Sequence, residues 1–306
     1  MLSRTAANLY WTGRYVERAD ATARLLAMGA RMTMLPGAAT RGDWQSVLQT
    51  AGVPLPEDGL TGRREAIEAL LLAPGGSSIK ACFEAARSNG RAERTALTSL
   101  MWEALNDDWR ALEVVNVAAA SQSLPDHIDW AHRRAATFRG ATETTMLRDD
   151  RYDFLRLGGL IERAAMTLRL LDVKYLALLP ERDVVGGGRD LYQWTSLLLA
   201  SSALRAYHHV YRGDVKARNV ADLLLLNRAF PRAVALCADE AGAALDRLAG
   251  RYGQRHDCHD RANALCETLR NADTDTIFSD GLHEFVTETL DDVLALHSAI
   301  AEAYGF

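Results

Sequence analysis

The chain has 306 residues, of which 48% are hydrophobic and 25% charged, so it can bury a sizeable core and is neither disordered nor fibrous. Its 40 acidic and 35 basic residues give a formal net charge of −5. This balance excludes a protein whose main task is to coat nucleic acid or an anionic membrane, and we expect neither as a partner.

The four cysteines are too few and too scattered for a disulfide framework in a chain of this size. Charged residues interrupt the first twenty positions, which is unlike a secretion signal. No later apolar run reaches the roughly 18 to 20 residues that a membrane-spanning helix needs. We therefore expect a cytoplasmic protein.

Helix formers dominate the composition, and apolar residues recur at three- and four-residue steps, as in the run from Leu157 through Leu160 and Ala164 to Leu171. No alternating strand pattern is present. Proline and glycine divide the chain, with Leu35-Pro36-Gly37 as the first stop and Gly186-Gly187-Gly188 as a connector near the middle. We predict helices over 4–34, 43–51, 62–72, onward from Ser78, 91–120, 125–138, 152–178, 190–211, 215–226, 232–252, 256–271 and 283–303. The expected fold is an all-α helical bundle of about ten or more helices.

An internal repeat is the most informative feature of the sequence. A shift of 145 residues places 9–26 over 154–171 with eight of 18 positions identical. The matched pairs include Gly13/Gly158, Glu17/Glu162, Arg18/Arg163, Thr22/Thr167 and Arg24/Arg169. A weaker match at a shift of 155 aligns Cys82 with Cys237. We predict one domain built from two pseudo-symmetric halves, approximately 1–140 and 141–306.

Each repeat places a glycine one helical turn before a Glu-Arg pair. Glycine inside a helix costs roughly 0.5 to 1 kcal/mol relative to alanine, so its recurrence suggests close packing of another element at that point. Glu17 and Glu162 lie on otherwise apolar helices, where a buried carboxylate needs a partner, and Arg18, Arg24, Arg163 and Arg169 are within reach. Two interpretations follow. The pairs either fix the register of the bundle, or face one central cavity across a pseudo-twofold axis and bind an ionic ligand.

A set of arginines extends this second interpretation: Arg14, Arg18, Arg87, Arg91, Arg139, Arg163, Arg228 and Arg232. Arg87 and Arg91 share one helix face, and Arg228 and Arg232 flank a Phe-Pro turn at a helix start. We expect anion-facing corners in which Arg14, Arg87, Arg91, Arg228 and Arg232 keep free hydrogen-bond donors. The alternative is a surface on which these arginines pair with acidic residues.

Other kinds of chemistry find little support. His256, Cys258 and His259 lack the usual spacing of metal ligands, and the adjacent His208 and His209 point about 100° apart on a helix, so no metal or cofactor is expected. Cys82 and Cys237 lie on apolar helix faces, as core residues do. Two carboxylates at one cavity could take different pKa values, but neighbouring arginines would keep both ionised. We lean against an enzyme.

Several segments together resemble a known family. Residues 9–19 (LYWTGRYVERA) resemble the opening signature of the bacterial alpha-E proteins, and 86–91 (ARSNGR), 102–106 (WEALN), 154–158 (FLRLG) and 230–232 (FPR) resemble later motifs in order. Gly90 and Ala233 depart from the usual alanine and serine. The resemblance implies an all-helical protein encoded beside, or fused to, a circularly permuted ATP-grasp ligase and near a transglutaminase-like peptidase. It adds the motif residues Trp11 and Asn89 to the candidate site.

We therefore expect a helical companion of a peptide-ligating or peptide-modifying system. It would bind a peptide, an aminoacyl species, another anionic ligand or the ligase itself in a polar cavity between its halves. The alternatives are a transferase-type enzyme that uses the Glu-Arg motifs and a purely structural scaffold. The candidate residues are Trp11, Arg14, Glu17, Arg18, Arg87, Asn89, Arg91, Arg139, Glu162, Arg163, Arg228 and Arg232. The oligomeric state is left open.

Overall fold

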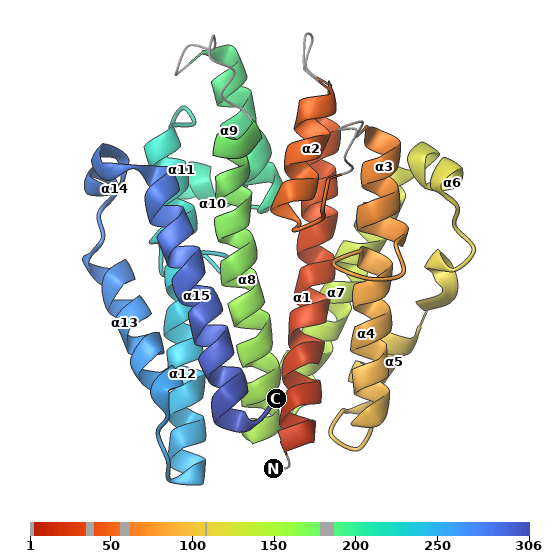
Figure 1. Cartoon of the computed structure of the whole chain (residues 1–306), viewed down its shortest axis with the longest axis vertical. Coiled ribbons are helices and arrows are strands. Elements are labelled where there is room, and N and C mark those ends of the chain that lie inside the picture. The colour runs from red at the N-terminus through yellow and green to blue at the C-terminus, as the bar shows by residue number, and fades with distance from the viewer. Residues whose placement is uncertain (1–2, 35–39, 56–61, 108, 178–186) are drawn as a thin grey trace.

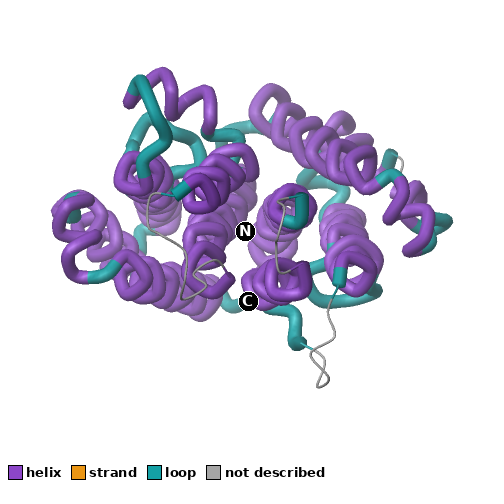
Figure 2. Tube along the Cα trace, turned by 90° about the horizontal axis from the view of Figure 1, so that it is seen from above, coloured by secondary structure: helices purple, strands orange, loops and turns teal. Residues whose placement is uncertain are grey.

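The computed structural model describes residues 3–34, 40–55, 62–107, 109–177 and 187–306. Within these ranges it contains helices and connecting loops and no strand (Figure 2). The first half holds α1 (Ser3–Met32), α2 (Thr40–Thr50), α3 (Arg63–Ile67), α4 (Ile79–Ala92), α5 (Ser99–Asn106), α6 (Val117–Gln122) and α7 (Leu124–Thr145). The remainder holds α8 (Asp150–Ala177), α9 (Gly188–Ala200), α10 (Leu204–Tyr211), α11 (Ala217–Leu225), α12 (Val234–Tyr252), α13 (Asp257–Asn271), α14 (Thr274–Asp280) and α15 (Leu282–Tyr304). The predicted all-α bundle is confirmed.

Helices α1 and α8 form the centre of the molecule and run side by side in the same direction (Figure 1). Helices α4 and α7 pack against α1, whereas α12 and α15 pack against α8. The two chain ends lie together at one end of the bundle, where a Cβ atom on Gly305 would be 3.3 Å from Ser3 Oγ. Residues far apart in sequence therefore meet along the α1/α8 contact.

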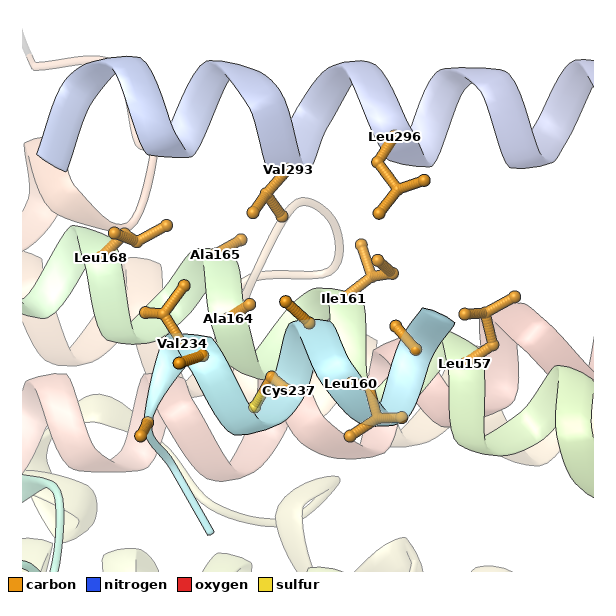
Figure 3. Close-up of a cluster of buried hydrophobic side chains, with 14 of the residues drawn as sticks. Leu157, Leu160, Ile161, Ala164, Ala165, Leu168, Val234, Cys237, Val293 and Leu296 are labelled. Carbon is orange, nitrogen blue, oxygen red and sulfur yellow. The ribbon is translucent and has the colours of Figure 1, made fainter. Parts of the chain in front are cut away.

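The apolar stripe of α8 explains why two helices cover it. Figure 3 shows Leu157, Leu160, Ile161, Ala164, Ala165 and Leu168 of α8 facing Val234 and Cys237 of α12 and Val293 and Leu296 of α15. All are buried. The three- and four-residue spacing places them on one side of the helix, and the two alanines allow α12 and α15 to approach closely. Each fully buried leucine contributes about 1.5 to 3 kcal/mol of transfer free energy.

Side-chain caps begin several helices. Ser78 Oγ accepts a hydrogen bond from the Ala81 N–H at 3.0 Å, which starts α4 where the sequence predicts it. Asp273 Oδ1 accepts from the backbone N–H groups of Asp275 and Thr276 and starts α14, a helix that the sequence analysis missed. A π-helical turn (Glu68–Leu72) extends α3, and a 3-10 turn (Trp109–Leu112) follows α5.

Two of the predicted helices are wrong. The helix expected over 91–120 is divided, because Thr98 and Asn116 cap new helices and so start α5 and α6. The helix expected over 190–211 ends at Ala200. Ser202 adopts a left-handed conformation (φ 55°) that no helix interior allows, and α10 begins after it. Of the expected Gly186-Gly187-Gly188 connector, Gly186 lies outside the described residues, Gly187 is the N-cap of α9 and Gly188 belongs to α9.

Among the helices described, none has both the length and the apolar character that crossing a bilayer requires.

Candidate functional site

The two repeated glycines bring the backbones of α1 and α8 into contact. A Cβ atom on Gly13 would lie 2.1 Å from the carbonyl oxygen of Leu155, and one on Gly158 would lie 2.0 Å from that of Tyr10. Tyr10 and Leu155 are themselves equivalent in the 145-residue repeat, so the two contacts are reciprocal. Any side chain would push the helices apart, which explains glycine at both positions. The symmetry of the complete halves stays a prediction.

The two Glu-Arg motifs pair with each other. Arg163 donates to Glu17 through Nε at 3.1 Å and Nη2 at 2.9 Å. Arg18 donates to Glu162 through Nε at 2.6 Å and Nη2 at 2.9 Å. Each glutamate thus receives a two-pronged, charge-assisted contact from the arginine of the other motif, and both carboxylates are buried. This reciprocal pair fastens α1 to α8.

Further arginines surround Glu17. Arg139 of α7 donates to Glu17 at 3.0 Å, and Arg232, just before α12, donates to it at 2.9 Å. Asp20, one turn along α1, is fully buried and accepts from Arg232 at 2.5 Å and from Arg24 at 3.2 Å. His132 Nδ1 lies 2.6 Å from its other oxygen. Helices α1, α7 and α8 and the loop before α12 therefore meet at two adjacent carboxylates.

On the other side of the helix pair, Glu162 has fewer partners. Arg14 donates to it through Nε at 2.8 Å, and Nη2 of Arg14 lies 2.7 Å from the same oxygen. The Arg14 guanidinium also lies 5.1 Å from the centre of the Trp11 ring, a cation–π contact. Arg169, two turns along α8 from Glu162, is partly buried on this side and lies within electrostatic range of Glu162 and Arg18.

Positive charge exceeds negative charge at this contact between α1 and α8. Among the residues that the structure describes, it contains three carboxylates, Glu17, Asp20 and Glu162, and seven guanidinium groups, those of Arg14, Arg18, Arg24, Arg139, Arg163, Arg169 and Arg232. The excess is four positive charges inside a chain whose formal net charge is −5. Such a concentration favours an anionic ligand.

A small cavity of about 30 Å³ lies beside Glu17, lined by Gly13, Phe138, Arg139, Thr142, Glu143, Arg156 and Arg163 among others. A wider groove of about 430 Å³ lies between α8 and α12, lined by Arg148, Tyr152, Asp153, Arg156, Leu160, Glu240, Ala243 and Arg247. Arg156 lines both and lies 2.6 Å from Glu240 and 3.5 Å from Glu143. Cavity and groove are therefore adjacent, with Arg156 between them.

The family comparison agrees with this architecture. A family model described as a predicted alpha-helical domain with a conserved ER motif, Alpha-E, matches residues 1–304. The chain belongs to the alpha-E family. No curated protein and no solved structure matches it.

In this alpha-E protein the buried carboxylates stay ionised. Burial alone would raise the pKa of Glu17, but the guanidinium groups of Arg163, Arg232 and Arg139 outweigh burial and hold that pKa well below its ordinary value. The same competition between burial and neighbouring cations lowers the pKa of Glu162, through Arg18 and Arg14. A carboxylate held ionised in this way is a poor general acid, which argues against transfer chemistry at the motifs.

Acid should therefore unfold this alpha-E protein. The pKa values of Glu17, Asp20 and Glu162 are all lowered in the folded state. Their contribution to stability is fully present above the unfolded-state pKa, about 4, and is lost as pH falls through the lower folded values. We expect the urea midpoint to be level from pH 7 to about pH 5 and to decline steeply below about pH 4. Asp246→Asn, at a surface pair with Arg255, should leave this profile unchanged, and a flat profile in acid would contradict the assignment.

Eight of the twelve predicted site residues meet at the α1/α8 contact: Trp11, Arg14, Glu17, Arg18, Arg139, Glu162, Arg163 and Arg232. The other four lie elsewhere. Arg87 donates to Asn106 at 3.0 Å, and Arg228 pairs with Asp239 at 2.7 Å. Asn89 is half-buried and Arg91 is exposed near the end of α4. Arg87, Asn89 and Arg91 lie on α4, and Arg228 lies in the loop between α11 and α12.

Four of the five arginines expected to be free have protein partners, although Nη1 of Arg14 is without an acceptor. Arg14 and Arg232 pair with buried carboxylates, Arg228 with Asp239, and Arg87 with an amide oxygen. Of the expected partners of the two glutamates, Arg18 and Arg163 do pair with them, whereas Arg24 does not. Arg24 bonds Asp20 rather than Glu17, because successive turns of α1 place Asp20 directly before Arg24.

Asp20, His132 and Arg156 were missed by the sequence analysis. Asp20 has Ala165 as its equivalent in the second repeat, so a search for identical pairs passes over it. An aspartate within an otherwise apolar stripe, one turn before an arginine, is the signal that could have found it. His132 and Arg156 carry no comparable signal. His132 reaches the site only through the packing of α7, and Arg156 of α8 meets its partners Glu143 and Glu240 only through the packing of α7 and α12.

The cysteines and histidines have structural surroundings. Burial raises the pKa of the Cys82 and Cys237 thiols to about 12, which makes both poor nucleophiles. His259 is buried, with Nε2 3.1 Å from the Leu245 carbonyl oxygen. Within the described ranges, no three His, Cys, Asp or Glu side chains converge as a metal site would require.

Proposed function

We propose that this alpha-E protein is a non-catalytic, cytoplasmic binding subunit of a peptide-ligating or peptide-modifying system. It holds the carboxylate of a peptide ligand beside Glu17. The family resemblance suggests an ATP-grasp ligase and a transglutaminase-like peptidase as its partners. The observation that carries the proposal is that Arg139, Arg156 and Arg163 line one small cavity and that Arg156 also lines the adjacent groove.

The size of the cavity suits a small charged group. About 30 Å³ is room for two or three water molecules or one carboxylate, and Arg139, Arg156 and Arg163 line it. A guanidinium group has five N–H donors, so one that already bonds a protein carboxylate retains donors for a ligand. The carboxylate of the ligand would enter this cavity from the groove.

The groove suits the remainder of a zwitterionic ligand. It has the volume of a small-molecule site and contains Asp153 and Glu240, which would pair with an amine, beside Arg148 and Arg247. The Arg148 guanidinium lies 4.1 Å from the centre of the Tyr152 ring. This ring supplies an apolar part of the groove lining. A peptide combines an amine, a carboxylate and apolar parts, which is the combination that this surface matches.

Arg156→Gln tests this site without removing a partner of Glu17 or Glu162. Calorimetric titration with a tripeptide that has a free C-terminal carboxylate should show binding, and the C-terminal amide of the same peptide should bind at least tenfold more weakly. In Arg156→Gln the loss should be about 1 to 3 kcal/mol, the range for a charged hydrogen bond left unmade. Arg255→Gln, which removes a surface partner of Asp246, is the control. Equal binding of acid and amide would exclude carboxylate recognition.

The partner part of the proposal has its own experiment. An ATP-grasp protein of the kind that the family resemblance implies should co-purify with the chain, and ATP turnover by that protein should change when the chain is added. If neither occurs while the tripeptide still binds, the chain is a binding protein without this partner.

The reciprocal Glu-Arg pairs favour one alternative, a structural scaffold. The carboxylate oxygens of Glu17 and Glu162 accept hydrogen bonds from arginines of the opposite motif, as expected of groups that hold two helices together. The two proposals differ in the arginines around these glutamates: a scaffold needs no ligand at Arg156. The scaffold would be favoured if the wild-type protein bound no peptide and Glu17→Ala did not fold.

A further inference from the structure

The repeat predicts equal surroundings for Arg24 and Arg169, yet the two arginines differ. Arg24 is buried and fully bonded: it donates to Asp20 at 3.2 Å, to the Ala200 carbonyl at 2.7 Å and to Ser202 Oγ at 2.7 Å. Asp20 stands one helical turn before it and forms an ion pair with it. The second repeat has Ala165 in that place, one turn before Arg169.

Arg169 has no such counter-ion among the residues that the structure describes. The polar contact of its guanidinium there is Nη1 to Met166 Sδ, at 3.6 Å, and sulfur is a weak acceptor. Burial lowers the pKa of Arg169, and the positive charges of Arg18 and Arg14 lower it further. Glu162 opposes them, but both of its oxygens already accept from Arg14 and Arg18.

A second difference between the two sides is the residue that accepts a hydrogen bond from the repeated threonine. Thr22 Oγ1 donates to the Ser77 carbonyl at 3.0 Å, and the equivalent Thr167 Oγ1 donates to the Arg232 carbonyl, also at 3.0 Å. The side chain of Arg232 also donates to Asp20, whereas Ser77, at the equivalent place, has only a short side chain. The Glu162 side therefore lacks both the carboxylate and the arginine that fill the Glu17 side.

Arg14 supplies an independent sign of unmet hydrogen bonding here. It is 5% exposed, and its Nη1 atom is buried without an acceptor. Three guanidinium groups, those of Arg14, Arg18 and Arg169, thus share one carboxylate. Buried polar groups without partners are rare in proteins and point to a missing ligand or ion.

We propose that Arg169 is the main contact of a second binding site, specific for a small oxyanion, on the Glu162 side of α1 and α8. The ligand group is a phosphate or a carboxylate, and it occupies the place relative to Arg169 that the Asp20 carboxylate occupies relative to Arg24. Arg169 is partly exposed, so the anion reaches it from solvent, whereas Arg24 is enclosed. This site is separate from the groove at Arg156 and does not depend on the proposed function.

Thermal unfolding at constant ionic strength tests the site, with chloride replaced stepwise by inorganic phosphate or by acetate. Phosphate or acetate should raise the wild-type midpoint in a saturable way, and the ion with the lower half-saturating concentration identifies the class of ligand group. Arg169→Met should abolish the rise, Arg169→Lys should retain a weaker one, and Arg156→Gln should retain it fully. Failure of the peptide test at Arg156 leaves this result unaffected.

The matched variant Arg24→Met separates an anion site from a structural role. In chloride buffer without phosphate or acetate, Arg169→Met should unfold at or above the wild-type midpoint, because it removes an uncompensated charge. Arg24→Met should unfold below it, because it leaves Asp20 short of a partner. No saturable rise in the wild type, an equal rise in Arg169→Met, or a fall in Arg169→Met as large as that in Arg24→Met would each overturn the proposal.

Discussion

Glu162→Ala is expected to destabilise the protein by about 3 to 5 kcal/mol, because it leaves the guanidinium groups of Arg14 and Arg18 buried without a carboxylate. For a domain of this size the loss corresponds to a drop of about 10 °C in the thermal midpoint. Glu17→Ala should behave in the same way, since Arg139, Arg163 and Arg232 all donate to Glu17. Calorimetry or circular dichroism on the purified variants measures the change.

Two controls define what this loss means. Glu162→Gln keeps the shape and one acceptor oxygen, so it should be destabilised less than the alanine variant. Asp246→Asn removes one member of an exposed ion pair and should change stability by less than about 1 kcal/mol. Unchanged melting of both Glu17→Ala and Glu162→Ala would mean that the Glu-Arg motifs do not hold α1 and α8 together.

The long helices could be predicted from sequence because their apolar stripes are uninterrupted. Helix α8 begins two residues before the helix predicted over 152–178, and the last predicted residue lies outside the described residues. Prediction of helices from the sequence failed where one residue changes the course of the backbone. Thr98 caps a new helix, and Ser202 takes a left-handed conformation. These are local hydrogen-bonding effects that hydrophobic periodicity does not report.

The repeat could predict the members of the site but not their pairing. It identified Glu17, Arg18, Glu162 and Arg163, because equivalent positions carry identical residues. Which arginine bonds which glutamate depends on the direction and spacing of α1 and α8, and these follow from the backbone contact at Gly13 and not from periodicity. The repeat did not identify Asp20 for the opposite reason, since the two repeats carry different residues at that position.

Gly13→Ala and Gly158→Ala are each expected to destabilise the folded protein strongly. Overpacking of a core usually costs about 1 to 3 kcal/mol, and the larger values arise where no side chain can move aside. Here the new methyl group would meet a backbone carbonyl at 2.1 Å in the first variant and at 2.0 Å in the second. The helices must separate to accept it, which lengthens the Glu-Arg contacts. We expect a loss of more than about 3 kcal/mol and little folded protein.

Gly140→Ala provides the matched control. Gly140 lies within α7, and a Cβ atom added there would meet nothing within 4 Å. Alanine should stabilise this position by about 0.5 to 1 kcal/mol, because it restricts the unfolded chain without any clash. The same substitution is therefore expected to have opposite signs at Gly140 and at Gly13. If Gly13→Ala and Gly158→Ala melt like the wild type, α1 and α8 are not in backbone contact, and the cross-pairing of the two Glu-Arg motifs needs another explanation.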